Sequence, residues 1–101
     1  MDYLKEYQIS DDEIITIKEN IEENNLNLDL FIYESEKIKK ILDLFLSIGV
    51  TNLYDILITN PMLFGESLNY IENKINNYHD KIELKELLNE DAHNLRVINL
   101  Y

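Results

Sequence analysis

An apolar stripe at helical spacing, followed directly by a glycine, constrains the fold of this chain more than any other feature. Apolar residues recur every three or four positions from Ile38 to Ile48, and Gly49 comes next. Positions three and four apart share one face of a helix, so the spacing predicts an amphipathic helix over residues 34–48. Gly49 is the expected stop, because glycine readily adopts the left-handed conformation that ends many helices.

Helix signals also cover most of the remaining chain. We expect Thr51 to cap a short helix, Asn60-Pro61 to end that helix and start a turn, and Ser67 to open the next helix. A further helix is expected from residue 81 onward. The 101 residues include only two glycines and one proline, which is few for a turn-rich β fold. The sequence therefore predicts one all-α domain, a compact bundle of five to six short helices.

The predicted core combines apolar residues from several of these helices. Its central members are Ile41, Leu42, Phe45, Ile56, Phe64, Leu68 and Ile71. Met62 and Ile82 are expected to face the same core. Two segments leave the choice of conformation open. Residues 27–33 fit a buried turn or short helix better than a strand, and residues 91–101 fit a helix or an extended segment equally well.

The first third of the chain carries a strongly acidic helix candidate. Ser10 and Glu13 fit a capping box, which predicts a helix over residues 11–23. Isoleucines 14, 17 and 21 form its buried stripe, with Ile15 at the margin. At about 100° per residue, the acidic residues fall on or beside the opposite face. The candidate partner-binding residues are Asp11, Asp12, Glu13, Glu19, Glu22 and Glu23.

The negative charge is concentrated at this end of the protein. The formal net charge is −11, of which residues 1–36 carry −9 and residues 37–101 carry −2. Such a surface repels nucleic-acid phosphates and attracts basic surfaces. The expected partner is therefore a protein with a basic surface that normally binds nucleic acid, with no direct binding of nucleic acid and no membrane contact. Charge runs are commonly solvated faces, so a role in solubility alone stays open.

The middle of the chain, residues 34–78, carries a resemblance to a known helical repeat. The residues in question are Ile48-Gly49-Val50 and Asn60-Pro61-Met62-Leu63-Phe64. They resemble the repeat of the mitochondrial transcription termination factor (mTERF) family, in which a Leu-Gly-hydrophobic helix end precedes a second helix that ends in a proline and an apolar pair. Family members stack such repeats into a basic surface that holds duplex nucleic acid. The resemblance thus implies an alternative function as a nucleic-acid-binding module that uses Lys37, Lys39, Lys40, Lys74, Lys81, Lys85 and Arg96.

No residue pattern predicts catalysis or a cofactor. His79 and His93 are the only histidines, and their spacing fits no common metal-ligand pattern. The chain has no cysteine, which excludes disulfides and thiolate metal sites. We therefore expect a non-enzymatic protein without metal or cofactor.

The remaining sequence features concern where the protein is found and which known proteins it is similar to in size and charge. No apolar run approaches the ~20 residues of a membrane span, and the acidic N-terminus does not fit a signal peptide, so a cytoplasmic protein is expected. The abundance of asparagine and isoleucine suggests a bacterial or phage source. In size and charge the chain is similar to small acidic phage proteins, including many anti-CRISPR proteins. That similarity suggests an inhibitor that mimics nucleic acid.

Overall fold

The computed structural model describes residues 1–100. These residues form six α-helices and three short 3₁₀-helices and no β-strand, which confirms the predicted all-α class. In chain order the elements are η1 (Asp2–Tyr7), α1 (Asp11–Glu23), α2 (Leu28–Tyr33), α3 (Ser35–Ser47), α4 (Leu53–Thr59), η2 (Pro61–Gly65), α5 (Leu68–Asn76), α6 (Lys81–Glu90) and η3 (Ala92–Ile98).

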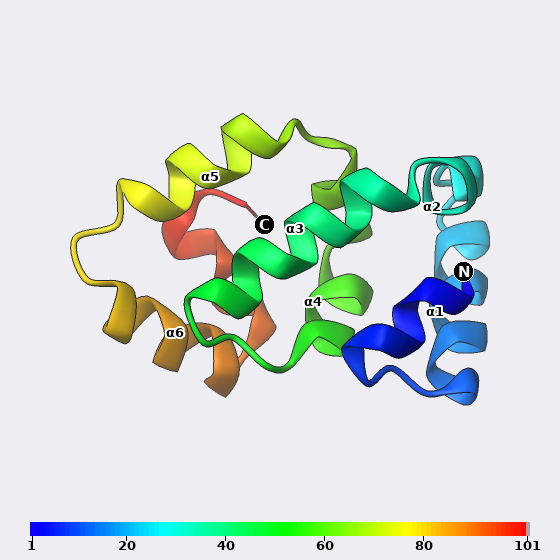
Figure 1. Cartoon of the computed structure of the whole chain (residues 1–101), viewed down its shortest axis with the longest axis horizontal. Helices are drawn as coiled ribbons and strands as arrows, with labels where there is room; N and C mark the ends of the chain where they lie inside the picture. Colours follow the sequence, from blue (N-terminus) through cyan, green and yellow to red (C-terminus); the bar gives the residue numbers. More distant parts are fainter. Residues whose placement is uncertain (101) are drawn as a thin grey trace.

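Helices α3 and α4 lie in the middle of the molecule and join its two ends (Figure 1). Helix α3 packs against η1, α2, η2 and α5, while α4 packs against α1, η2 and η3. The elements η1, α1 and α2 form one end, and α5, α6 and η3 form the other. The acidic first third of the sequence therefore becomes one end of a body that measures 35 × 23 × 22 Å.

The core is a single cluster of buried apolar side chains, and none of the described buried residues is polar or charged. All three phenylalanines are buried, and the ring centroids of Phe31 and Phe64 lie 6.0 Å apart. Leu68 packs against the core and is only half-buried. The other six predicted central members are fully covered, as expected: Ile41, Leu42, Phe45, Ile56, Phe64 and Ile71.

Four of the six α-helices start at a side-chain cap, whereas α3 and α4 begin without one. The Ser10 hydroxyl accepts the Glu13 N–H at 3.1 Å, and the Glu13 carboxylate accepts the Ser10 N–H at 2.9 Å, so the capping box is confirmed. Ser67 caps α5 by accepting the N–H of the third helical residue. The prediction for Thr51 is wrong, because α4 begins after Asn52 and has no side-chain cap. The Thr51 N–H is bound by a side chain of α6 instead.

Four of the helices, η1, α1, α3 and η3, end at a left-handed residue that is followed by an apolar one. Gly49 has φ of 96°, and its N–H donates to the Leu46 carbonyl at 2.9 Å. The next N–H, of Val50, reaches back to the Phe45 carbonyl at 3.1 Å, which completes a Schellman motif and buries Val50. Gly49 is thus confirmed as the stop of α3. The same left-handed conformation occurs at Gln8, Asn25 and Asn99.

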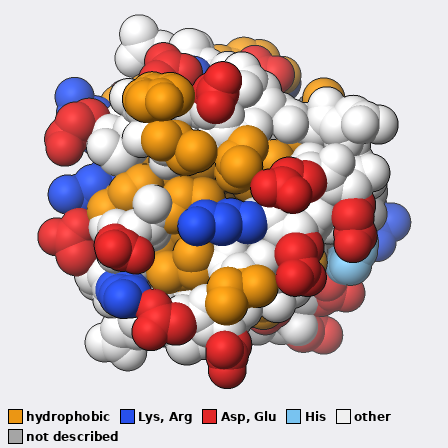
Figure 2. Space-filling view, turned by 90° about the vertical axis from the view of Figure 1, so that its right-hand side faces the viewer, with side chains coloured by type: hydrophobic (Ala, Val, Ile, Leu, Met, Phe, Trp, Pro, Cys, Tyr) orange, Lys and Arg blue, Asp and Glu red, His pale blue; other side chains and the backbone are white. Residues whose placement is uncertain are grey.

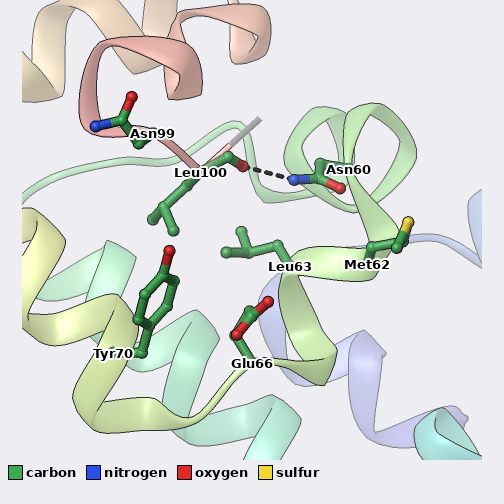
Figure 3. Close-up of a pocket in the computed structure, with 7 residues that line it drawn as sticks. All are labelled: Asn60, Met62, Leu63, Glu66, Tyr70, Asn99 and Leu100. Atoms are coloured by element: carbon green, nitrogen blue, oxygen red, sulfur yellow. Dashed lines mark hydrogen bonds between the residues drawn. The ribbon is translucent and has the colours of Figure 1, made fainter.

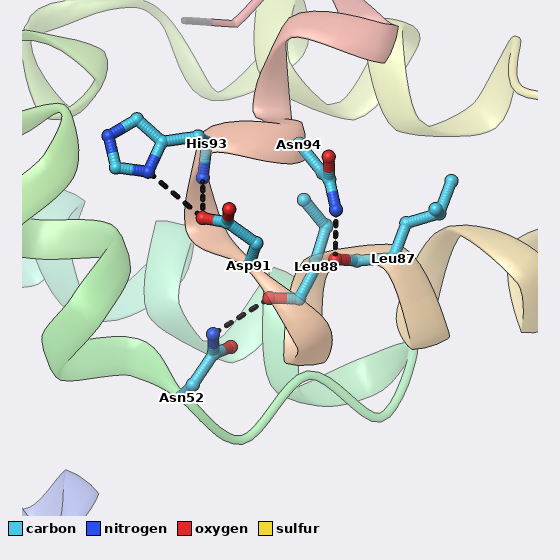
Figure 4. Close-up of polar contacts among 6 residues, drawn as sticks. All are labelled: Asn52, Leu87, Leu88, Asp91, His93 and Asn94. Carbon is cyan, nitrogen blue, oxygen red and sulfur yellow. Dashed lines mark hydrogen bonds and ion pairs between the residues drawn. The ribbon is translucent and has the colours of Figure 1, made fainter.

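Asparagine side chains connect different segments of the fold. Each of five asparagines donates from Nδ2 to a backbone carbonyl of another segment, and we call these contacts the asparagine ties. They run from Asn20 to Ile58, Asn52 to Leu88, Asn60 to Leu100, Asn89 to Gly49 and Asn94 to Leu87. Figure 4 shows two of them at the end of α6. The Nδ2 of Asn52 makes this bond, but the Oδ1 of the same side chain is buried and has no hydrogen-bond partner.

Two apolar residues that were expected in the core lie outside it. Met62 and Ile82 are each 67% exposed, so their predicted burial is wrong. Met62 lies in the short helix η2 together with Leu63 and Phe64. Leu63 and Phe64 point into the core, and Met62 does not. Ile82 lies in the first turn of α6, whose inward face is defined by residues four apart, Leu84 and Leu88.

The structure also settles the two segments that the sequence left open. Residues 28–33 form helix α2, which buries Phe31 and leaves Tyr33 80% exposed. Residues 92–98 form η3, which buries Ala92, Leu95 and Ile98 at helical spacing. The described part of the tail is therefore helical up to Ile98. Tyr101, the last residue of the predicted tail, lies outside the described residues.

Candidate functional site

The candidate site is the solvent-facing side of α1. Its start is fixed by the Ser10 capping box, and its rotation is fixed by the buried isoleucines Ile14, Ile17 and Ile21. Together these two constraints decide which acidic side chains point outward. Five of the six candidate acids are exposed and Glu13 is half-buried. The helix thus presents its acids at the outer surface of one end of the molecule.

The six acids do not all remain available to a partner. Asp11 forms an ion pair with Lys5 at 2.8 Å, and this pair raises the pKa of Lys5. Glu13 is held by the capping box. The remaining four carboxylates form no hydrogen bond or ion pair with residues 1–100, and we call them the free acids of α1. They are Asp12, Glu19, Glu22 and Glu23.

An exposed isoleucine lies among the free acids. Ile15 is 53% exposed, although the sequence pattern places it at the margin of the buried stripe. Asp12 is three residues before Ile15, and Glu19 is four residues after it, so both lie beside it on the helix surface. Sequence reasoning missed Ile15 as a surface residue. The available signal was its position next to Ile14, since one narrow stripe cannot bury both neighbours.

The end of the molecule that carries α1 has a mixed surface. Figure 2 shows this end, with apolar side chains gathered across its middle and acidic side chains around and between them. Lysine side chains also lie on this face, so the acids do not form an unbroken patch. The exposed apolar residues of α1 and α2 are Ile15, Ile32 and Tyr33. A mixed surface of this kind suits a protein partner, because interfaces combine an apolar centre with polar surroundings.

Several of the basic side chains implied by the mTERF-like alternative are engaged within the molecule. Lys39 forms an ion pair with Glu6 at 3.1 Å, and Lys37 donates to the carbonyl of Gly65 at 3.1 Å. The ammonium of Lys74 lies 5.2 Å from the centre of the Tyr70 ring. Three of the seven basic residues therefore contact groups of the protein itself.

The two histidines have separate local partners. His79 Nε2 lies 2.8 Å from the carboxylate of Glu83, one turn away. His93 Nδ1 lies 2.9 Å from Asp91 Oδ1, and the same oxygen accepts the His93 N–H at 2.9 Å (Figure 4). These bonds from the backbone and the ring of His93 lower the pKa of Asp91. Within residues 1–100, no three histidine, aspartate or glutamate side chains are grouped so that they could hold a metal ion.

Comparisons with known proteins add no family assignment. No family model, no curated protein and no solved structure matches this chain. Among the described residues, no helix has the length and apolar character needed to cross a membrane.

Proposed function

We propose that this protein is a non-enzymatic binding protein that docks the outer face of α1 on a basic surface of a partner protein. The observation that carries the proposal is the exposed Ile15 with the free acids Asp12 and Glu19 beside it, and with Glu22 and Glu23 about two turns further along the same helix. The carboxylates would pair with arginine or lysine side chains of the partner, and Ile15 would supply apolar contact at the centre. The basic surface in question is one that otherwise holds nucleic acid, so docking would inhibit nucleic-acid binding by the partner.

The charge distribution supports an effect on association more than on final affinity. Complementary charges steer two proteins together and raise the association rate, and salt screens this effect. Because residues 1–36 carry −9 of the total −11, the attraction would orient the α1 end toward the partner. The same charge opposes direct binding to a nucleic-acid duplex. Binding to the partner should therefore slow with salt and compete with nucleic acid.

The test uses a charge-reversal variant of α1 and a matched control. The variant carries Asp12→Lys, Glu19→Lys and Glu23→Lys, which should leave α1 folded because all three side chains are exposed. The control carries Glu72→Lys, Glu86→Lys and Glu90→Lys, which changes the net charge by the same amount at exposed positions of α5 and α6. The partner is first captured with the unmodified protein and identified. Association rates are then measured for all three proteins at low and moderate salt.

We expect the α1 variant to associate at least ~10-fold more slowly than the control at low salt, because attraction becomes repulsion. We also expect the unmodified protein to displace labelled nucleic acid from the partner. Equal association rates for the two variants, with intact helical spectra, would assign the α1 acids to solubility. A failure to displace nucleic acid would contradict the inhibitor role while leaving the docking face in place.

A further inference from the structure

A surface hollow at the other end of the molecule carries an inference that is independent of α1. The hollow has a volume of about 240 Å³ and lies between η2, α5 and the segment after η3. Figure 3 shows Leu63, Tyr70 and Leu100 around it, with Glu66 beside them. One wall is fixed by the asparagine tie from Asn60 to the Leu100 carbonyl. No residue of α1 lines this hollow.

The walls of the hollow combine apolar and polar side chains, and the hollow is open to solvent. Leu63 and Leu100 are buried members of the core, so they form a firm inner surface. Tyr70 is 41% exposed and presents its ring on one side, and Met62 is exposed at the rim. The Lys74 ammonium near the Tyr70 ring helps to hold that ring in place. A ligand that enters the hollow therefore needs an apolar portion.

Glu66 is the one charged residue among those that line the hollow. Its carboxylate forms no hydrogen bond or ion pair with residues 1–100. Tyr70 and Asn99 also line the hollow. The Tyr70 hydroxyl points toward Leu100 and has no hydrogen-bond partner among these residues, whereas the Asn99 side-chain amide points away from the hollow (Figure 3). The hollow thus combines apolar side chains with one carboxylate and one hydroxyl, both without internal partners.

We infer that this hollow binds an arginine side chain presented by a partner protein. Arginine has an apolar stem that can lie along Leu63 and Leu100, and a charged guanidinium that can pair with Glu66. The planar guanidinium can also donate two parallel hydrogen bonds to the two oxygens of the Glu66 carboxylate, a geometry that the compact ammonium of lysine does not offer. Its five N–H donors exceed what one carboxylate accepts, and the Tyr70 hydroxyl oxygen can accept from one of the others.

The inference is tested by titrating isotope-labelled protein with a blocked tripeptide, Gly-Arg-Gly, and following the backbone amide signals by NMR. Two further peptides carry lysine or norleucine in place of arginine. We expect saturable shifts at the amides of Leu63, Tyr70 and Leu100 with the arginine peptide. The lysine peptide should bind more weakly and the norleucine peptide should not bind.

The variant Glu66→Gln and the control Glu72→Gln separate a specific site from general attraction to an acidic protein. Both remove one exposed carboxylate, but Glu72 does not line the hollow. Glu66→Gln should weaken the arginine peptide about fivefold or more, while Glu72→Gln should bind as the unmodified protein does. Equal affinities for the two variants, or shifts confined to α1, would overturn the inference. Equal binding of the lysine peptide would overturn the assignment to arginine. Because no α1 residue is altered, either result leaves the α1 proposal unaffected.

Discussion

The side-chain amide of Asn89 on α6 binds the chain at Gly49, where its Nδ2 donates to the Gly49 carbonyl at 3.1 Å. The Oδ1 of the same amide accepts the N–H of Thr51 at 2.9 Å. One side chain therefore holds both sides of the turn between α3 and α4. The stem of Lys85 crosses the same turn, since a Cβ atom on Gly49 would lie 2.5 Å from Lys85 Cδ.

Asn89→Ala removes both of these hydrogen bonds. We expect it to lower the free energy of unfolding by about 1–2 kcal/mol, because each net bond contributes roughly 0.5–1.5 kcal/mol and water replaces part of it. Urea unfolding followed by helical signal measures the change. Asn73→Ala on α5 is the control, because its side chain is exposed and makes no tie. Equal losses in the two variants would show that the Asn89 amide contributes nothing specific.

Gly49→Ala places a side chain on a residue whose φ is 96°. We expect a loss of about 1–2 kcal/mol from backbone strain, with a small addition because the flexible Lys85 stem must move. Gly65→Ala is the matched control. The Gly65 φ is not left-handed, and its added Cβ would meet only Leu30 Cδ2 at an ordinary 3.9 Å. Thermal unfolding of both variants should show a lower midpoint for Gly49→Ala alone, and similar midpoints would contradict the assigned strain.

Phe45→Ala and Ile82→Ala separate two residues that the apolar pattern treats alike. Phe45 is fully buried, so Phe45→Ala should lower the free energy of unfolding by about 3–5 kcal/mol. That loss is a large part of the stability of a domain this small. Ile82 is 67% exposed, so its truncation should change stability by less than about 0.5 kcal/mol. Denaturant titrations give both values. A large loss for Ile82→Ala would mean that α6 is rotated from the orientation described.

Two tyrosines near the N-terminus should make stability fall at high pH. Burial raises the pKa of Tyr3 to about 12, and burial together with the hydrogen bond to Asp43 raises the pKa of Tyr7. Because the folded pKa values exceed the unfolded value of 10.0, the stabilisation is complete below pH 10 and is lost as the pH rises toward 12. The double variant Tyr3→Phe, Tyr7→Phe should lose stability less steeply over this range. An unchanged slope would show that other groups cause the loss.

The sequence predicted those features that depend on neighbouring residues. The capping box at Ser10, the stop at Gly49 and the stripe of Ile14, Ile17 and Ile21 all involve residues a few positions apart, and all are found in the structure. Each of these features is determined by local backbone geometry, so the spacing of the residues in the sequence is enough to predict it.

Features that depend on packing between distant residues were not predictable. Whether Met62 faces the core depends on how much room the neighbouring helices leave, and it is exposed. Asn52 sits where a cap would be expected, but it binds the Leu88 carbonyl on α6. The hollow beside Glu66 needs residues more than thirty positions apart to meet. The six acids of α1 were identified, but their division into free and engaged side chains required the structure.

The asparagine ties have a consequence for how this protein responds to its surroundings. Amide groups carry no net charge and do not titrate, so the cross-links between helices are insensitive to ionic strength and to acidification. The outer face of α1, in contrast, presents carboxylates, whose attraction to a basic surface is screened by salt. Salt therefore acts on the charged α1 surface and leaves the asparagine ties between segments unchanged. Under the proposed function, added salt would release a partner without breaking these ties.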